Sequence, residues 1–298
     1  MTTAIDVAGL TKQYRGTPVL RGVDLTAEQG EILALLGSNG AGKTTTISIL
    51  TTLAKADGGT AVVAGCDLRR DPEGVRRRIS LTGQSAAVDD ALTGVENLVM
   101  LGRLSGLSPR AARGRADELL NRFDLVEAAS RRVKTYSGGM RRRLDLALSF
   151  VVTPQVLFLD EPTTGVDPRS RLGLWEVIRS LADAGTTVFL TTQYLEEADQ
   201  LADRIAVLHD GRIERIGTAA ELKAQFGSDM LVAEGPDGAV LAEIATDGSV
   251  AGIRRALDDL EAAHPGARVQ LRRPTLDDVF LSLTAPGRSE RLTTREYA

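Results

Sequence analysis

The chain has 298 residues, of which 43% are hydrophobic and 26% are charged, a composition that suits a folded protein with a substantial core and excludes global disorder. Its 36 basic and 40 acidic residues give a net charge of −4, so no general excess of positive charge favours a nucleic-acid backbone. One cysteine and two histidines argue against a Cys/His metal cluster. No apolar run approaches the roughly 20 residues of a membrane-spanning helix, so a membrane role would require a partner.

The first 83 residues predict several short strands and one helix. Two patterned runs open the chain, and the nearly unbroken apolar run 31–36 is typical of a strand that is buried on both faces. The expected strands are 4–14, 18–28, 31–36, 59–65 and 77–83, and the expected helix is 47–55.

Helical periodicity follows from about residue 95 to 150, and the pattern of buried strands then returns. The sequence Asp210-Gly211 is typical of a two-residue hairpin turn. The expected elements are strands at 156–160 and 186–192, helices at 170–185 and 194–203, and a hairpin over 204–217. These elements predict a mixed α/β core with a helical insertion between its strands.

Residues 37–44 read G-S-N-G-A-G-K-T between an expected strand and an expected helix, which matches the phosphate-binding loop G-x-x-x-x-G-K-[ST]. Backbone N–H groups of such a loop converge on a phosphate, and the helix presents its positive end to the same anion. Lys43 would reach the β- and γ-phosphates, and the Thr44 hydroxyl would bind Mg²⁺. The predicted ATP-binding residues of this segment are Gly37, Ser38, Asn39, Gly40, Ala41, Gly42, Lys43, Thr44 and Thr45.

Two acids, Asp160 and Glu161, follow a predicted buried strand, at the end of a sheet where α/β folds bind their ligands. Successive side chains of a strand point to opposite sides, so the two acids should have different roles. Asp160 suits Mg²⁺, and Glu161 can accept a proton from the attacking water. We therefore predict Lys43 and Glu161 as catalytic residues.

A phosphate loop alone would also fit GTPases and kinases, and the sequence Y-S-G-G-M at 136–140 narrows the choice. Ser137, Gly138 and Gly139 precede an expected helix and offer a hydroxyl and backbone N–H groups to a second anion. With this order of motifs, residues 4–226 resemble the ATP-binding-cassette (ABC) ATPases, whose signature usually reads LSGGQ. The resemblance implies an α/β fold: a phosphate-loop core with an antiparallel β subdomain and a helical subdomain, plus a small α+β module at the C-terminus.

The resemblance assigns roles to three further residues. Tyr14 matches the aromatic residue that stacks on adenine, although an ordinary tyrosine at a strand end is the alternative. Gln84 matches the glutamine that senses Mg²⁺ and the γ-phosphate. Asp167 matches the loop that crosses the dimer interface.

Two departures from the family pattern stand out. Tyr136 and Met140 replace the usual Leu and Gln of the signature, while its central Ser-Gly-Gly is kept. Gln193 stands where most cassettes carry a catalytic switch histidine, and an amide can hydrogen-bond a phosphate but cannot carry a proton charge. The sequence around Gln193, together with the segment P-T-L-D-D-V-F-L-S-L-T near the C-terminus, most resembles the daunorubicin/doxorubicin-resistance branch of drug-export ATPases.

The resemblance implies an ATP-hydrolysing subunit that uses Mg²⁺, forms a homodimer with two ATP molecules at the interface, and energises export through a separate membrane permease. Such a subunit would lie on the cytoplasmic face of the cell membrane. The alternative is a soluble ABC ATPase that acts on ribosomes or DNA. Two arginine runs, 76–78 and 141–143, are interpreted as solvated helix faces or as lying near anionic lipid, and no nucleic-acid partner is expected.

The expected domains are a nucleotide-binding domain over 1–226, with its helical subdomain at about 90–150, an accessory module over 227–284 and a flexible tail over 285–298. In the module, Thr275 and Asp278 predict a capping box for a final helix. The apolar helix faces are predicted as Val250, Ile253, Ala256, Leu257 and Leu260, and as Leu276, Val279, Phe280 and Leu283. The last face would dock on its own cassette or at the dimer or permease interface.

Overall fold

The computed structural model of the protein describes residues 2–83, 88–225 and 227–284. The chain divides into two compact units, Met1–Ile216 and Gly217–Ala298. The predicted magnesium ligand Gln84 and the predicted flexible tail 285–298 lie outside the described residues. Within the described ranges, no helix is both long enough and apolar enough to cross a membrane.

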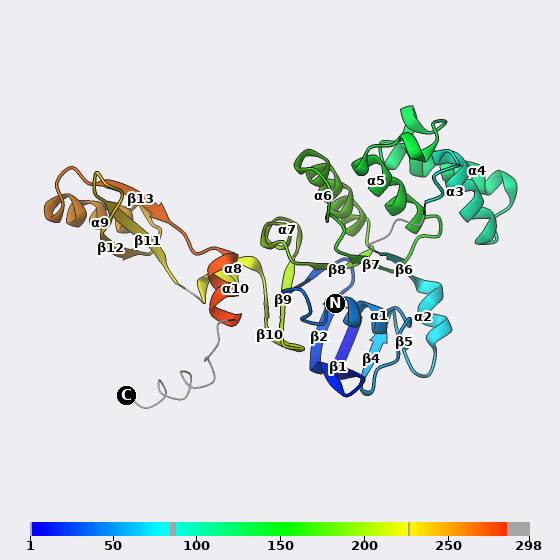
Figure 1. The fold of residues 1–298 in the computed structure, drawn as a ribbon, viewed down its shortest axis with the longest axis horizontal. Helices are drawn as coiled ribbons and strands as arrows, with labels where there is room; N and C mark the ends of the chain where they lie inside the picture. The colour runs from blue at the N-terminus through cyan, green and yellow to red at the C-terminus, as the bar shows by residue number, and fades with distance from the viewer. Residues whose placement is uncertain (1, 84–87, 226, 285–298) are drawn as a thin grey trace. The chain divides into compact units, whose positions relative to one another are not determined.

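The first unit opens with an antiparallel sheet in the order β2-β1-β4-β5 (Figure 1). Near the start of β1, Ile5 and Val7 are buried while Asp6 is exposed, the period-two pattern of a sheet with one covered face. The strands are β1 (Thr3–Tyr14), β2 (Thr17–Glu28), β4 (Gly58–Val63) and β5 (Cys66–Asp67). This sheet confirms the expected antiparallel subdomain.

The second sheet of this unit has six strands in the order β10-β9-β3-β8-β7-β6. Its members are β3 (Ile32–Leu36), β6 (Ile79–Thr82), β7 (Val156–Asp160), β8 (Thr187–Thr192), β9 (Arg204–His209) and β10 (Arg212–Gly217). Pairing is parallel from β9 through β3, β8 and β7 to β6. Every residue of β3, β7 and β8 is buried, which explains their nearly unbroken apolar runs. Asp210 and Gly211 both have positive φ, 47° and 74°, so the expected hairpin turn is confirmed.

Helices of the first unit fall into two groups. Those beside the six-stranded sheet are α1 (Lys43–Leu50), α2 (Pro72–Arg78), α6 (Pro168–Asp183) and α7 (Leu195–Leu201). The helical insertion between β6 and β7 contains α3 (Gly94–Leu104), α4 (Pro109–Arg122), α5 (Gly138–Ser149) and the 3-10 turns η1 (Val126–Ala128) and η2 (Val133–Thr135), and α3 to α5 group together in Figure 1. The helix expected at 47–55 was misplaced: α1 begins at Lys43, directly after the left-handed Gly42, and ends at Leu50.

In its described residues, the second unit combines a small sheet, in the order β12-β11-β13, with three helices. Its elements are α8 (Ala219–Ala224), β11 (Asp229–Glu234), β12 (Val240–Thr246), α9 (Val250–Ala263), β13 (Arg268–Arg272) and α10 (Leu276–Thr284). Ala256 and Leu260 of α9 are buried against β11. Val250 and Leu257, which we expected on the same face, are 76% and 39% exposed, because the small sheet covers only a narrow stripe of α9.

The last helix, α10, begins as the sequence predicts. Thr275 Oγ1 accepts a hydrogen bond from the Asp278 N–H at 3.2 Å, and Asp278 Oδ2 accepts one from the Thr275 N–H at 2.9 Å, which confirms the capping box. Its apolar residues Leu276, Val279 and Leu283 are buried, and α10 contacts α8 within the same unit.

Candidate functional site

Three segments that are far apart in sequence meet at the carboxyl ends of neighbouring parallel strands. The phosphate loop follows β3, Glu161 follows β7, and Gln193 follows β8, which lies between those two strands. Because parallel strands end at the same edge of a sheet, this order brings the predicted phosphate ligand, base and switch residue together.

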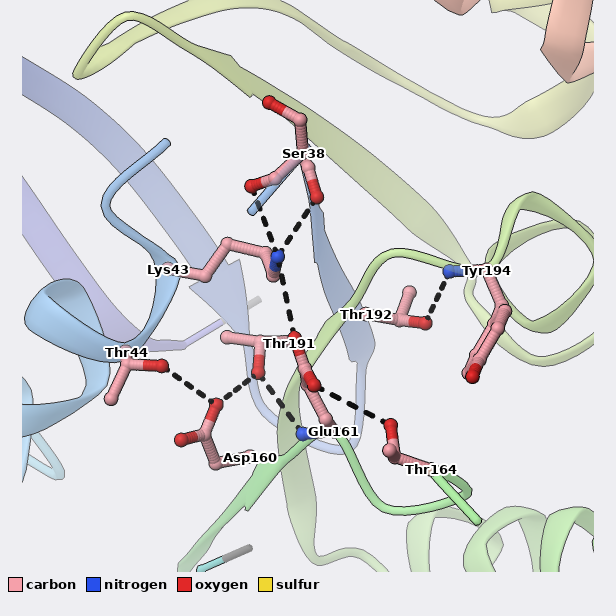
Figure 2. A network of polar contacts seen from close by, with 10 residues as sticks. Ser38, Lys43, Thr44, Asp160, Glu161, Thr164, Thr191, Thr192 and Tyr194 are labelled. Carbon is pink, nitrogen blue, oxygen red and sulfur yellow. Dashed lines mark hydrogen bonds and ion pairs between the residues drawn. The ribbon is translucent and has the colours of Figure 1, made fainter. Parts of the chain in front are cut away.

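The side chain of Lys43, near the end of the phosphate loop, folds back onto the first residues of the loop. Lys43 Nζ donates hydrogen bonds to the carbonyls of Gly37 at 2.9 Å and Ser38 at 3.2 Å (Figure 2). Gly42, the N-cap of α1, has φ 113° and no side chain caps the helix, so the first N–H groups of α1 remain available to an anion. A Cβ at Gly42 would overlap the Leu20 side chain, so this position requires glycine.

Asp160 is buried beside the phosphate loop. Its Oδ1 accepts hydrogen bonds from Thr191 Oγ1 at 2.6 Å and from Thr44 Oγ1 at 3.4 Å (Figure 2). A carboxylate and a hydroxyl in this arrangement are oxygen ligands that suit Mg²⁺ together with phosphate oxygens and water. The two described residues of the predicted magnesium set are therefore brought together.

Glu161 lies between the phosphate loop and the turn that follows β7. Its Oε1 is 3.4 Å from Lys43 Nζ, and its Oε2 accepts a hydrogen bond from Thr164 Oγ1 at 3.4 Å. Its N–H donates to the carbonyl of Thr191 at 3.1 Å. The Glu161 backbone is left-handed, with φ 50°, a conformation that strains a residue with a side chain. The hydrogen bonds around Glu161 hold this strained turn in place.

Gln193 lies directly after β8 and Tyr14 lies at the end of β1, the positions that the sequence predicts for them. Gln193 is half-buried between β8 and α7, and the N–H of the next residue, Tyr194, donates to Thr192 Oγ1 at 2.9 Å. Tyr14 ends β1 with its side chain exposed and with Lys12 Nζ 5.2 Å from the ring centre. An open aromatic face of this kind can stack on a base, so the stacking role stays a prediction.

The signature residues begin α5. Ser137 is its N-cap and accepts a hydrogen bond from the Met140 N–H at 3.2 Å. Tyr136, in place of the usual leucine, is buried, and its hydroxyl donates a hydrogen bond to the carbonyl of Ala128 at 2.8 Å. This bond joins the residue before the signature serine to η1 within the helical subdomain. A cavity of about 450 Å³ has Gly138 and Glu161 among its lining residues. In the described part of the first unit, no hydrogen bond joins Ser137, Gly138 or Gly139 to the phosphate loop.

Asp167 is the N-cap of α6 and accepts a hydrogen bond from the Ser170 N–H at 3.0 Å. Hydrogen bonds from the Ser170 side chain and backbone hold the pKa of Asp167 below its ordinary value. Capping of α6 is a sufficient local reason for an aspartate at this position, and the role of Asp167 at a dimer interface stays a prediction.

The burial of two charged residues near the site was not predicted from the sequence. Arg142 is only 8% exposed, so the interpretation of its arginine run as a solvated face is wrong at this position. Glu197 is fully buried and accepts a hydrogen bond from Trp175 Nε1 at 3.1 Å, and burial raises the pKa of its carboxyl. Neither residue belongs to a motif that the sequence analysis recognised, and their burial depends on packing between distant segments.

Comparisons with known proteins add an independent observation. A family model described as "ABC transporter" matches residues 20–164. The chain is 50% identical to the daunorubicin/doxorubicin resistance ATP-binding protein of Streptomyces peucetius, over 98% of this chain and 96% of that protein. A solved ATP-binding subunit of an ABC transporter is 30% identical, with a TM-score of 0.66 over 75% of this chain and 93% of the other. A solved dimeric ATP-binding cassette bound to ADP and phosphate is 24% identical, with a TM-score of 0.64 over 72% and 98%, and it is similar in fold.

Proposed function

Because the chain belongs to the ATP-binding subunits of ABC transporters and is therefore an ATPase, we propose that it powers the export of a drug, antibiotic or other hydrophobic compound through a separate membrane permease. A relative that is 50% identical over nearly the whole chain is named for resistance to daunorubicin and doxorubicin. This relationship favours an exporter subunit over a soluble ABC ATPase that acts on ribosomes or DNA.

The observation that carries the catalytic part of the proposal is the 3.4 Å distance between Lys43 Nζ and Glu161 Oε1. It puts the carboxylate beside the amine that would hold the β- and γ-phosphates, which is where a base must lie to reach the attacking water. Lys43 and the N–H groups at the start of α1 would bind and orient the phosphates. Glu161 would take the proton from water, while Thr191 keeps the neighbouring Asp160 turned toward Thr44.

ABC ATPases use Mg²⁺ together with ATP, and the metal neutralises charge on the phosphates. In this chain Thr44 and Asp160 would hold it, and Gln84 is the third ligand expected from the sequence. Gln193 would donate its amide to the γ-phosphate without changing protonation state, so the rate of hydrolysis should not depend on a titration at this position.

ABC ATP-binding subunits dimerise and pair with a membrane permease. For this chain we propose a homodimer in which Ser137, Gly138 and Gly139 of one copy contact the ATP on the phosphate loop of the other, with Asp167 at the interface. Ser137 and Gly138 lie at the uncrowded start of α5, where a Cβ at Gly138 would meet nothing within 4 Å. Pairing with a permease would place the subunit on the cytoplasmic face of the membrane.

The test of the catalytic assignment is the variant Glu161→Gln in the full-length chain. We expect it to bind ATP with near-parental affinity and to lose at least about 100-fold in kcat, the usual contribution of a positioned base. Lys43→Ala should instead weaken ATP binding itself, because it removes a phosphate contact. Fluorescent-nucleotide titration and phosphate release would separate the two effects, and near-normal turnover by Glu161→Gln would remove it from the role of base.

A further inference from the structure

Arg142 connects three segments of the first unit through one side chain. It lies in α5, which begins with the signature residues, and its Nε donates to the carbonyl of Pro162 at 2.7 Å. Its Nη1 donates to the carbonyl of Gly83 at 2.9 Å and to Asp145 Oδ2 at 3.0 Å. The signature helix is thereby tied to the turn after β7 and to the chain just after β6.

Both carbonyls belong to segments that carry site residues. Pro162 directly follows Glu161, whose left-handed backbone is strained, and a residue before proline is restricted further by the proline ring. A strained turn persists only when its surroundings hold it. Arg142 holds it at the Pro162 carbonyl, one residue after the Glu161 N–H that donates to Thr191. Gly83 directly follows β6 and precedes Gln84 in sequence, and the same guanidinium holds its carbonyl at the carboxyl end of that strand.

The choice of arginine is informative because burying its charge is unfavourable. Burial lowers the pKa of Arg142, while the Asp145 carboxylate opposes this effect. The planar guanidinium can donate to two carbonyls at fixed angles, and a lysine amine has no such fork. Lysine would keep the charge beside Asp145 without reproducing both carbonyl contacts.

The surroundings of the turn also contain unused hydrogen-bonding capacity. Arg142 Nη2 is buried and has no hydrogen-bond partner among the described residues, whereas the Thr163 side chain lies close enough to Glu197 to lower the pKa of that carboxyl. Buried polar atoms are nearly always paired. One donor of Arg142 is therefore left over at this turn, in addition to the three hydrogen bonds that its side chain donates.

Resting on the proposed ATPase function, we propose that Arg142 is a positioning residue that couples the signature helix α5 to the Glu161 turn and to Gly83 at the carboxyl end of β6. A shift of α5, when Ser137 to Gly139 contact a phosphate, would move the carbonyls of Pro162 and Gly83. The catalytic base of one ATP site would thus respond to the nucleotide bound at the other.

The kinetic test compares Arg142→Lys with Arg143→Gln in the full-length chain. Arg143 is a matched control because it lies in the same helix but pairs with Asp124 at 2.7 Å, away from the turn. Arg142→Lys should keep KM for ATP within about threefold and lower kcat at least about 10-fold, since small displacements of a reacting group have large effects on rate. Arg143→Gln should keep kcat within about twofold. Parental kcat in Arg142→Lys, or equal losses in both variants, would overturn the proposal.

Coupling to the signature is tested by a double variant. If Arg142 transmits the effect of Ser137, then Ser137→Ala and Arg142→Lys disturb one pathway, and their combined loss of kcat should be smaller than the product of the two single losses. Losses that multiply would show that the two residues act independently and would overturn the coupling.

A second measurement does not depend on hydrolysis. The N–H groups of Thr164 and Val166 donate within the turn, to the carbonyls of Glu161 and Thr163. Hydrogen exchange at these two amides should speed up at least about 10-fold in Arg142→Lys and in Arg142→Met, and not in Arg143→Gln. Unchanged exchange in both Arg142 variants would refute the positioning role. If the parental chain did not hydrolyse ATP, the proposed function would be wrong. Hydrogen exchange at these two amides would still test whether Arg142 positions the turn.

Discussion

Asp160 and Glu161 are neighbours in sequence, yet their carboxylates have different surroundings. Asp160 belongs to β7 and is held by two threonine hydroxyls, whereas Glu161 lies just beyond the strand and faces Lys43. Because β7 ends at Asp160 and the Glu161 backbone is left-handed, the change of backbone conformation separates the two carboxylates that we propose as metal ligand and base. The division of roles predicted from the sequence therefore has a geometric basis.

Glu197 is a buried acid whose ionisation should make stability depend on pH. Burial raises the pKa of its carboxyl above the ordinary 4.5, against opposing hydrogen bonds from Thr192 and Trp175. The folded protein therefore binds this proton more tightly than the unfolded chain does. Its contribution to stability is complete below the ordinary pKa, and the free energy of unfolding falls as pH rises from that value through the raised pKa.

We predict that Glu197→Gln, which mimics the protonated acid, is more stable than the parent at about pH 8 and gains little at about pH 4, with about 1.4 kcal/mol for each unit by which the pKa is raised. Urea unfolding at both pH values would measure this difference. Glu196→Gln is the matched control, because Glu196 is exposed and pairs with Arg171 at the surface. Parallel pH profiles for the parent and Glu197→Gln would contradict the prediction.

At the scale of elements, the start of α5 shows two adjacent glycines with different requirements. A Cβ at Gly139 would overlap Ser170 of α6, whereas a Cβ at Gly138 would meet nothing within 4 Å. Gly139 is therefore needed for the packing of α5 on α6, in addition to any contact with a nucleotide. Gly138 has no such structural requirement, which is compatible with the close approach of a phosphate that we propose there.

We predict that Gly139→Ala destabilises the protein by about 1–3 kcal/mol through overpacking, and that Ser170→Gly in the same chain restores part of this loss. Gly138→Ala should leave stability nearly unchanged and lower ATP hydrolysis, because its methyl group would occupy the approach to the helix N-terminus. Thermal unfolding and phosphate release would distinguish the two variants. Equal destabilisation by both substitutions would show that the difference in packing is not important.

At the scale of the whole molecule, the two units have separate hydrophobic cores. The core of the first unit draws its buried residues from Ala4 to Leu208, and the second unit has its own cluster around Leu231 and Leu260. The apolar face of α10, for which the sequence left two docking sites open, is buried, and α10 contacts α8 in its own unit. Covering of this face therefore does not require a partner subunit.

We predict that a chain cut after Ile216 unfolds cooperatively and binds ATP with near-parental affinity, because its core and phosphate loop are intact. It should associate more weakly with itself and with the permease, the role we expect for the accessory module. A chain cut after residue 226 is the comparison, since it keeps α8 without α10 and should be less stable. Sedimentation and co-purification would test this, and unchanged association in the shorter chain would limit the module to local stabilisation.

The sequence by itself determined the phosphate loop, the paired acids, the buried strands, the helical insertion and the Thr275 capping box. These features depend on contiguous residues, whose local geometry and apolar pattern are written in the order of the chain. Only the tertiary structure decided that β8 lies between β3 and β7, that Arg142 bonds Pro162 and Gly83, and that Gly139 packs on Ser170. Each of these contacts joins segments that are distant in sequence, and the environment of such a side chain is set by its neighbours in space.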